Sequence, residues 1–256
     1  MKKLFPVLLI ALVWAFGSCT VFAITADEVL QGVENRNIGK TSQSETIMKL
    51  INTDGNERNR TMNIYRRKID NDNKDNFIHF LAPTDIKDTT YLVNEKSRER
   101  LKWIYLSAMK KIRKIQADDY AAAFVSSDFA YEDMDDIHAS DYECSNLVEE
   151  KLDGEDVYSI DVKKKDGKTS YSKTTMKVSK EKMLPLKSLM FDKNDPTKQV
   201  KELTSGDLEK IQDIWTPKTV TMKDLVKGTS TVLAIKNIKY DVSLEDSVFT
   251  ESNMQK

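Results

Sequence analysis

Few residues of this chain belong to types that catalyse reactions or bind metals. There are only two histidines, His79 and His138, and two cysteines, Cys19 and Cys144. His79 lies in a segment where apolar and polar residues alternate, whereas His138 lies in an acidic segment. Carboxylates near His138 would suit calcium, but their spacing matches no EF-hand loop, and acidic loops are usually solvated. The sequence therefore predicts no metal site and no cofactor.

A serine nucleophile is not indicated either. Ser126 and Ser127 stand directly before Asp128, but the chain has no Gly-x-Ser-x-Gly turn that would expose a nucleophile. Neither histidine has the sequence context of a catalytic triad. A hydrolase that used the carboxylates between residues 128 and 136 would need a paired-carboxylate cleft, and no such pattern is present. We therefore predict that the protein is not an enzyme.

Four basic residues gather in one short stretch, namely Lys110, Lys111, Arg113 and Lys114. Two interpretations are open: the solvated face of a hairpin, or a patch that contacts lipid headgroups or an acidic partner surface. The whole chain has a net charge of −1 at pH 7. This balance gives no general attraction to nucleic acid, so we expect no nucleic-acid partner.

The N-terminal residues are typical of an export signal. Two lysines precede an uncharged apolar run at residues 4–16, and residues 21–23 (Val-Phe-Ala) fit a cleavage site. We expect cleavage after this site, which leaves residues 24–256 as one domain. A retained membrane anchor and lipidation at Cys19 are the alternatives. Cleavage would remove Cys19 and leave Cys144 with no cysteine to pair with. We expect Cys144 to be a small buried apolar residue.

The elements that must position these residues are mostly strands. Residues 25–36 predict a helix, because Thr25 and Glu28 have capping-box spacing and an apolar stripe follows. Downstream, the apolar period changes to two and Asp-Gly turns recur, which predicts about ten to twelve antiparallel strands. Residues 117–143 break this pattern, and we expect irregular structure with one or two helical turns there. Candidate strands lie at residues 46–51, 61–67, 76–81, 89–94, 101–106, 110–116, 146–152, 157–162, 171–178, 184–191, 199–203, 218–222, 229–233 and 235–240.

One candidate strand has apolar residues on both faces. Leu101, Trp103 and Tyr105 share one face because side chains alternate along a strand, and Ile104 and Leu106 share the other with a lysine. A strand that is apolar on both faces is covered on both sides. Its aromatic residues, like those of neighbouring strands, would suit either a packed core or the wall of an apolar cavity.

Two motifs carry a resemblance to a known family. Residues 103–115 read Trp-Ile-Tyr-Leu-Ser-Ala-Met-Lys-Lys-Ile-Arg-Lys-Ile, and residues 127–134 read Ser-Asp-Phe-Ala-Tyr-Glu-Asp-Met. Together with Phe-Leu-Ala-Pro at residues 80–83, they resemble the outer-membrane lipoprotein-sorting family, relatives of the LolA carrier. The motif positions are Ser127, Asp128, Phe129, Tyr131, Glu132 and Asp133.

The resemblance implies an incompletely closed antiparallel β-barrel, or curled sheet, with a few helices as a lid over its apolar concave side. It also implies a periplasmic carrier whose partners are lipoprotein acyl chains or another envelope lipid, and possible further partners are an inner-membrane exporter and an outer-membrane acceptor. We expect a monomer. The alternative is an interaction module that binds an envelope exporter and fills its own interior. The residues predicted to line the lipid cavity are Phe80, Tyr91, Leu101, Trp103, Tyr105, Phe124 and Phe129.

Overall fold

The computed structural model describes residues 23–255. Apart from Ala23, the expected export signal lies outside these residues, and so does Cys19. The first element is helix α1 (Ala26–Asn35), at the predicted place. The Glu28 N–H donates to Thr25 Oγ1 at 3.2 Å, and the Thr25 N–H donates to the Glu28 carboxylate at 2.7 Å. This reciprocal cap satisfies N–H groups at the start of the helix.

Strands form most of the described chain, and each is antiparallel to its neighbours. Within residues 23–255 they make one sheet of fourteen strands, in the order β6-β5-β4-β3-β2-β1-β13-β12-β11-β10-β9-β8-β7, and β14 pairs with β1. Their bounds are β1 (Thr41–Ile51), β2 (Glu57–Lys68), β3 (Lys74–Ala82), β4 (Thr90–Lys96), β5 (Glu99–Leu106), β6 (Lys111–Lys114), β7 (Tyr142–Leu152), β8 (Glu155–Lys164), β9 (Tyr171–Ser179), β10 (Pro185–Asp192), β11 (Gln199–Ile211), β12 (Ile214–Asp224), β13 (Thr229–Ile235) and β14 (Lys239–Tyr240).

The predicted fold class, a mainly β protein with an incompletely closed antiparallel sheet, is confirmed. The predicted total of ten to twelve strands was too low, although each of the fourteen candidate segments overlaps a strand; the segment expected at 235–240 is reduced to two residues paired with β1. The Asp-Gly turns are where the sequence placed them. Gly55 and Gly154 follow their aspartates with φ of 81° and 89°, a backbone region that glycine enters without the strain of a Cβ.

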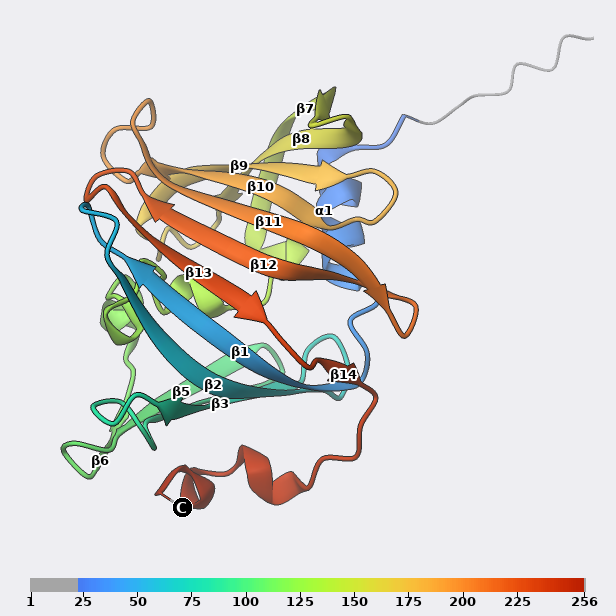
Figure 1. Cartoon of the computed structure of the whole chain (residues 1–256). Coiled ribbons are helices and arrows are strands. Elements are labelled where there is room, and N and C mark those ends of the chain that lie inside the picture. Colours follow the sequence, from blue (N-terminus) through green and yellow to red (C-terminus); the bar gives the residue numbers. More distant parts are fainter. Residues whose placement is uncertain (1–22, 256) are drawn as a thin grey trace, which may run out of the picture.

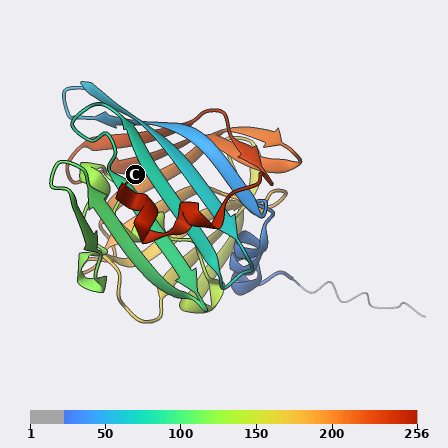
Figure 2. The same ribbon diagram turned by 90° about the horizontal axis from the view of Figure 1, so that it is seen from below.

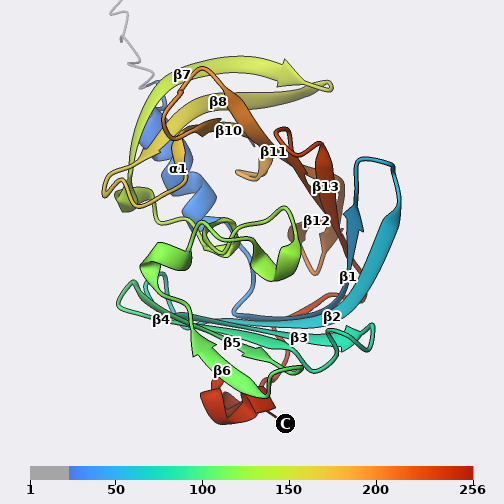
Figure 3. The same cartoon turned by 90° about the vertical axis from the view of Figure 1, so that its left-hand side faces the viewer.

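The sheet is curled into a cup that stays open along one side (Figures 1 and 3). Its two outer strands, β6 and β7, do not pair with each other, so the barrel is not closed. The first and second halves of the chain meet at β1 and β13, which pair from Thr46↔Ile235 to Ile51↔Ser230. Figure 3 shows α1 and the long β6–β7 connection standing inside the open side of the cup. No helix among residues 23–255 is long and apolar enough to cross a membrane.

Residues 115–141 connect β6 to β7 and form the crossing segment. It contains four short 3₁₀ helices, η1 (Ala117–Asp119), η2 (Phe124–Ser126), η3 (Glu132–Met134) and η4 (Ala139–Asp141). This confirms the prediction of irregular structure with helical turns. Because the segment lies across the concave side, its aromatic residues are buried against the sheet rather than exposed.

Two apolar clusters lie on opposite faces of strands β3 to β5. The inner cluster joins Phe80, Tyr91 and Ile104 of the sheet to Phe124 and Phe129 of the crossing segment. The outer cluster joins Phe77, Leu92 and Trp103 to Phe249 and Met254. The last two residues belong to η5 (Asp246–Phe249) and η6 (Glu251–Gln255), which lie across the outer face of the sheet (Figure 2). The prediction that β5 is covered on both faces is therefore confirmed.

Candidate functional site

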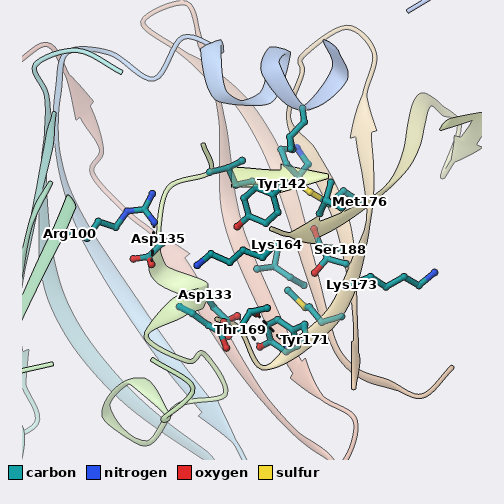
Figure 4. A pocket seen from close by; sticks show the side chains of 18 residues that line it. Arg100, Asp133, Asp135, Tyr142, Lys164, Thr169, Tyr171, Lys173, Met176 and Ser188 are labelled. Carbon is teal, nitrogen blue, oxygen red and sulfur yellow. Dashed lines mark hydrogen bonds and ion pairs between the residues drawn. The ribbon is translucent and has the colours of Figure 1, made fainter. Parts of the chain in front are cut away.

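A pocket of about 220 Å³ lies between α1, the crossing segment and strands β8 to β11 (Figure 4). Its apolar wall comes from elements far apart in the sequence: Leu30 of α1, Ile137 of the crossing segment, and side chains of four strands. The strand residues of this wall are Val162, Met176, Met190 and Leu203. These positions alternate inward along their strands, so the pocket is a product of the sheet's curl rather than of one motif.

Charged and polar groups form another part of the pocket lining. Arg100, Asp135, Tyr142 and Lys164 line it, together with Asp133. Figure 4 shows Arg100 and Asp135 on one side and Lys164 reaching across from β8. Burial raises the pKa of the Tyr142 phenol to about 12, so this hydroxyl stays neutral. The pocket is therefore amphipathic, with both apolar and charged groups in its lining.

A buried ion-pair cluster supports the charged part of this lining. The Lys102 ammonium is fully buried and lies 2.7 Å from Asp135, and Arg100 pairs with Glu95 at 3.0 Å. Burial lowers the pKa of Lys102 and raises the pKa of Asp135, because both charged forms are taken out of water. Removing one partner would leave the other charge uncompensated, so the pair fixes the crossing segment to β5.

His138 joins three elements in the same cluster. Its ring is fully buried, with Nδ1 3.0 Å from a carboxylate oxygen of Glu34 on α1 and Nε2 in contact with the Glu95 carboxylate on β4. The Ala139 N–H also donates to Glu34, at 2.9 Å. Hydrogen bonding to Glu95 raises the pKa of His138. His138 and the acidic residues that pair with it therefore face inward, unlike the usual solvated acidic loop.

A second ion-pair group holds the neighbouring carboxylate. Asp136 pairs with Arg66 of β2 and lies 3.8 Å from Lys74 of β3. Although burial opposes ionisation, these cations lower the pKa of Asp136 to about 2. We did not predict from the sequence that these carboxylates form buried ion pairs, although one feature of the sequence indicates such a pair. Lys102 shares a strand face with Ile104, and a lysine on a buried apolar face requires a carboxylate partner.

The motif carboxylates hold the crossing segment to the second half of the sheet. The Asp128 carboxylate accepts hydrogen bonds from the hydroxyls of Thr229 and Thr231 on β13. The Asp133 carboxylate accepts hydrogen bonds from the Tyr171 hydroxyl at 2.9 Å and from Lys201 at 3.0 Å.

The other motif residues make contacts near these two aspartates. Glu132 accepts a hydrogen bond from the Ser170 N–H at 3.0 Å, and Ser127 Oγ accepts one from the Phe129 N–H at 3.3 Å. Phe129 and Tyr131 are buried in the inner cluster. The motif thus combines polar attachment to the sheet with apolar burial against it.

The structure divides the seven residues predicted to line a cavity. Phe80, Tyr91, Phe124 and Phe129 lie in the inner cluster, where Tyr91 and Phe124 pack edge to face with ring centroids 5.1 Å apart. They are packed beside the pocket and are not among its lining residues.

The other three predicted residues lie on the opposite face of the sheet. Leu101, Trp103 and Tyr105 belong to the outer cluster, under the C-terminal segment. The prediction of a common face for them was correct, but its assignment to the concave side is corrected. Ile104 takes the inward position of β5, so its neighbours must point outward.

The remaining candidates lie away from the pocket. Lys110, Lys111, Arg113 and Lys114 are exposed at the β5–β6 turn and along β6, which is compatible with both the solvated hairpin and the headgroup or partner patch. Cys144 is only partly buried, and its burial raises the pKa of the thiol to about 11. No group of three metal-ligating side chains is present in the described part of the chain.

Comparisons with known proteins agree with this architecture. A family model described as an uncharacterized protein matches residues 72–256. A DUF1329 family protein from Desulfovibrio piger is 30% identical, with a TM-score of 0.83 over 90% of this chain and 98% of that one. No curated protein matches the sequence.

Two further solved structures share the fold. A putative outer-membrane lipoprotein-sorting protein domain from Vibrio parahaemolyticus is 25% identical, with a TM-score of 0.84 over 90% of this chain and 98% of that one. A LolA superfamily protein from Nitrosomonas europaea is 19% identical, with a TM-score of 0.68 over 90% and 99%. The open sheet, the crossing segment and these matches together show that the chain belongs to the DUF1329 family, with the LolA-like fold of lipoprotein-sorting proteins.

Proposed function

We propose that the protein is a non-enzymatic periplasmic carrier that shields acyl chains of lipoproteins or other lipids during transfer toward the outer membrane. The observation that supports this most strongly is the amphipathic pocket on the concave side of an open sheet. Its walls include α1 and the crossing segment, which are attached to the sheet mainly through side chains rather than by strand pairing.

The energetics of such a carrier are favourable. Burying one methylene is worth about 0.8 kcal/mol, so an acyl chain supplies on the order of 10 kcal/mol before ordering costs. The pocket of about 220 Å³ is smaller than the roughly 300–1,000 Å³ of most ligand sites. Loading a long chain therefore requires α1 and the crossing segment to move away from the sheet. The crossing segment is attached by ion pairs, hydrogen bonds and the apolar side chains of the inner cluster, so this movement separates side chains but breaks no strand pairing with the sheet.

The same small volume supports an alternative. The inner cluster fills part of the concave side with the protein's own side chains, including Phe124, Phe129 and Tyr131. An interaction module that docks on an envelope exporter would need no larger cavity. The carrier's partners would be a lipid or lipoprotein donor at the inner membrane and an acceptor at the outer membrane, whereas the module's partner would be the exporter.

Native mass spectrometry of the protein purified from its own host separates the two. A carrier is expected to retain lipid at a stoichiometry near one, and to release it when a hydrophobic acceptor such as empty vesicles is added. A protein that carries no lipid and takes up no fluorescent fatty-acid probe, while remaining folded by circular dichroism, would support the interaction module instead.

A further inference from the structure

The Lys164 side chain differs from the other charged groups of the pocket. It is the last residue of β8, and Figure 4 shows it extending across the pocket toward Asp135. Within residues 23–255, no carboxylate lies within 4.0 Å of its ammonium. Lys164 is near enough to lower the pKa of Asp135, but Asp135 is already paired with Lys102 at 2.7 Å, so the Lys164 ammonium makes no ion pair of its own and is available to bind an anion.

The other charged groups of the pocket already have partners. Arg100 pairs with Glu95 at 3.0 Å, and Lys173 pairs with Asp161 at 2.8 Å. The two aspartates are engaged as well: Asp133 with Lys201 at 3.0 Å, and Asp135 with Lys102 at 2.7 Å. Glu132 accepts the Ser170 N–H. Lys164 is thus the charged lining group that a ligand can engage without breaking an existing ion pair.

The apolar wall adjoins Lys164 on the same face of β8. Val162 lies two residues before Lys164 on the same strand, and alternation places both on one face. Met176, Met190 and Leu203 continue the apolar surface on β9, β10 and β11. A ligand with one anionic end and one hydrocarbon chain therefore matches the pocket at both ends.

We infer that this pocket binds a single-chain lipid with a free carboxylate, whose head group is held by Lys164 and whose chain lies on the apolar wall. The inference rests on the proposed carrier function and narrows its cargo. A monoanionic carboxylate matches one free ammonium. A head group of higher negative charge would meet Asp133 and Asp135 on the same wall, with no second free cation there to offset the repulsion.

The test compares dodecanoic acid with 1-dodecanol at pH 8, by calorimetric titration of the full-length mature protein. These probes share a chain and differ in charge. Wild-type protein is expected to bind the acid at least tenfold more tightly, which corresponds to about 1.4 kcal/mol. The Lys164→Gln variant is expected to bind both probes with the affinity that the wild type has for the alcohol. Lys164→Arg is expected to keep the preference, because a guanidinium also binds carboxylate.

Lys163→Gln is the matched control. Lys163 is the adjacent residue of β8, it is exposed, and its removal changes the net charge equally. Equal binding of acid and alcohol by the wild type would overturn the inference while leaving the carrier function standing, and so would a preference that survives in Lys164→Gln. Binding of neither probe by folded wild-type protein would instead contradict the carrier function itself.

Discussion

Three residues of β5 have different roles, and the alternation of side chains along the strand determines which role each residue has. Lys102 and Ile104 point into the cup, where one forms an ion pair and the other joins the inner cluster. Trp103 points outward beneath η5 and η6. The sequence predicted which residues share a face, because that depends only on the strand period. It did not predict which face is concave, because the direction of curl depends on pairings between strands far apart in the chain.

Replacing Trp103 by alanine tests this assignment. Its side chain is buried in the outer cluster, so the variant is expected to lose about 3–5 kcal/mol of unfolding free energy. Lipid affinity of the folded fraction is expected to stay unchanged, because Trp103 does not face the pocket. Urea titration and fatty-acid binding measure the two effects separately. Weakened lipid binding by a variant that is still folded would show that Trp103 belongs to the ligand site after all.

The Lys102–Asp135 pair is open to a double-mutant cycle. Lys102→Met alone leaves a buried carboxylate whose remaining ion-pair partner is Arg100 at 3.6 Å, and is expected to cost about 3–5 kcal/mol. Lys102→Met combined with Asp135→Asn is expected to cost less than the sum of the single variants, because the second change removes the stranded charge. Urea unfolding of the four proteins measures the coupling. Strictly additive losses would mean that the two side chains do not stabilise each other.

At the scale of elements, the crossing segment is attached at two ends by different chemistry. Its motif end is held by Asp128 and Asp133 to the second half of the sheet, and its other end is held by buried ion pairs to α1 and the first half. The sequence motif identified the residues that matter in the first case. It gave no indication of their structural role, because hydroxyl and amine partners on β9, β11 and β13 follow some 40 to 100 residues later.

Replacing Asp128 by alanine is expected to loosen the crossing segment without unfolding the sheet. The variant loses two hydrogen bonds between a carboxylate and threonine hydroxyls, each worth about 1.5–3 kcal/mol at most. Hydrogen exchange is expected to speed up in residues 115–141 and to change little in β7 to β12. Asp118→Ala, at an exposed position of the same segment, is the control. Equal exchange in both variants would show that Asp128 does not anchor the segment.

The His138 cluster predicts a pH dependence. The pKa of His138 is raised by its hydrogen bond to Glu95, so the native state holds the proton more tightly than the unfolded chain. The resulting stabilisation is fully present below the unfolded pKa of about 6.5 and is lost as pH rises through the higher native pKa. The urea midpoint is therefore expected to fall between pH 6 and pH 9.

The carboxylates of the cluster act in the opposite direction. Burial opposes their ionisation, but hydrogen bonds from Ala139 and His138 lower the pKa of Glu34 overall, and those from His138 and Arg100 lower the pKa of Glu95. Their contribution is lost as pH falls through these lowered values. His138→Gln is expected to flatten the alkaline limb, and also to weaken the acid limb, because His138 contributes to the lowered pKa of both carboxylates. His79→Gln is the control, because His79 is partly exposed and outside the cluster. An unchanged alkaline limb in His138→Gln would rule out this assignment.

At the scale of the whole molecule, one sheet joins the two halves of the chain. The sequence predicted strands and turns, because each leaves a local pattern. Pairing of β1 with β13 leaves none: it brings residues 46–51 beside residues 230–235 through a register that no local signal encodes. The inner cluster crosses the same seam, since Met48 and Met62 pack with Met190 and Met222. The prediction of one domain therefore depends on the strength of this seam.

Two tryptophans report on the two halves. In protein expressed from Ile24, Trp103 lies in the outer cluster of the first half, and Trp215 packs against Leu184 and Leu186 in the second. If the seam makes one cooperative unit, Trp103→Phe and Trp215→Phe proteins must each unfold with the same midpoint by fluorescence as by far-ultraviolet circular dichroism. Each single-tryptophan protein is compared with itself, so a loss of stability from the substitution does not matter. A fluorescence transition that precedes the loss of strand signal in either protein would show that its half unfolds alone. In that case α1 and the crossing segment would bridge two units, and opening of the cup would occur at the β1–β13 seam rather than at the lid.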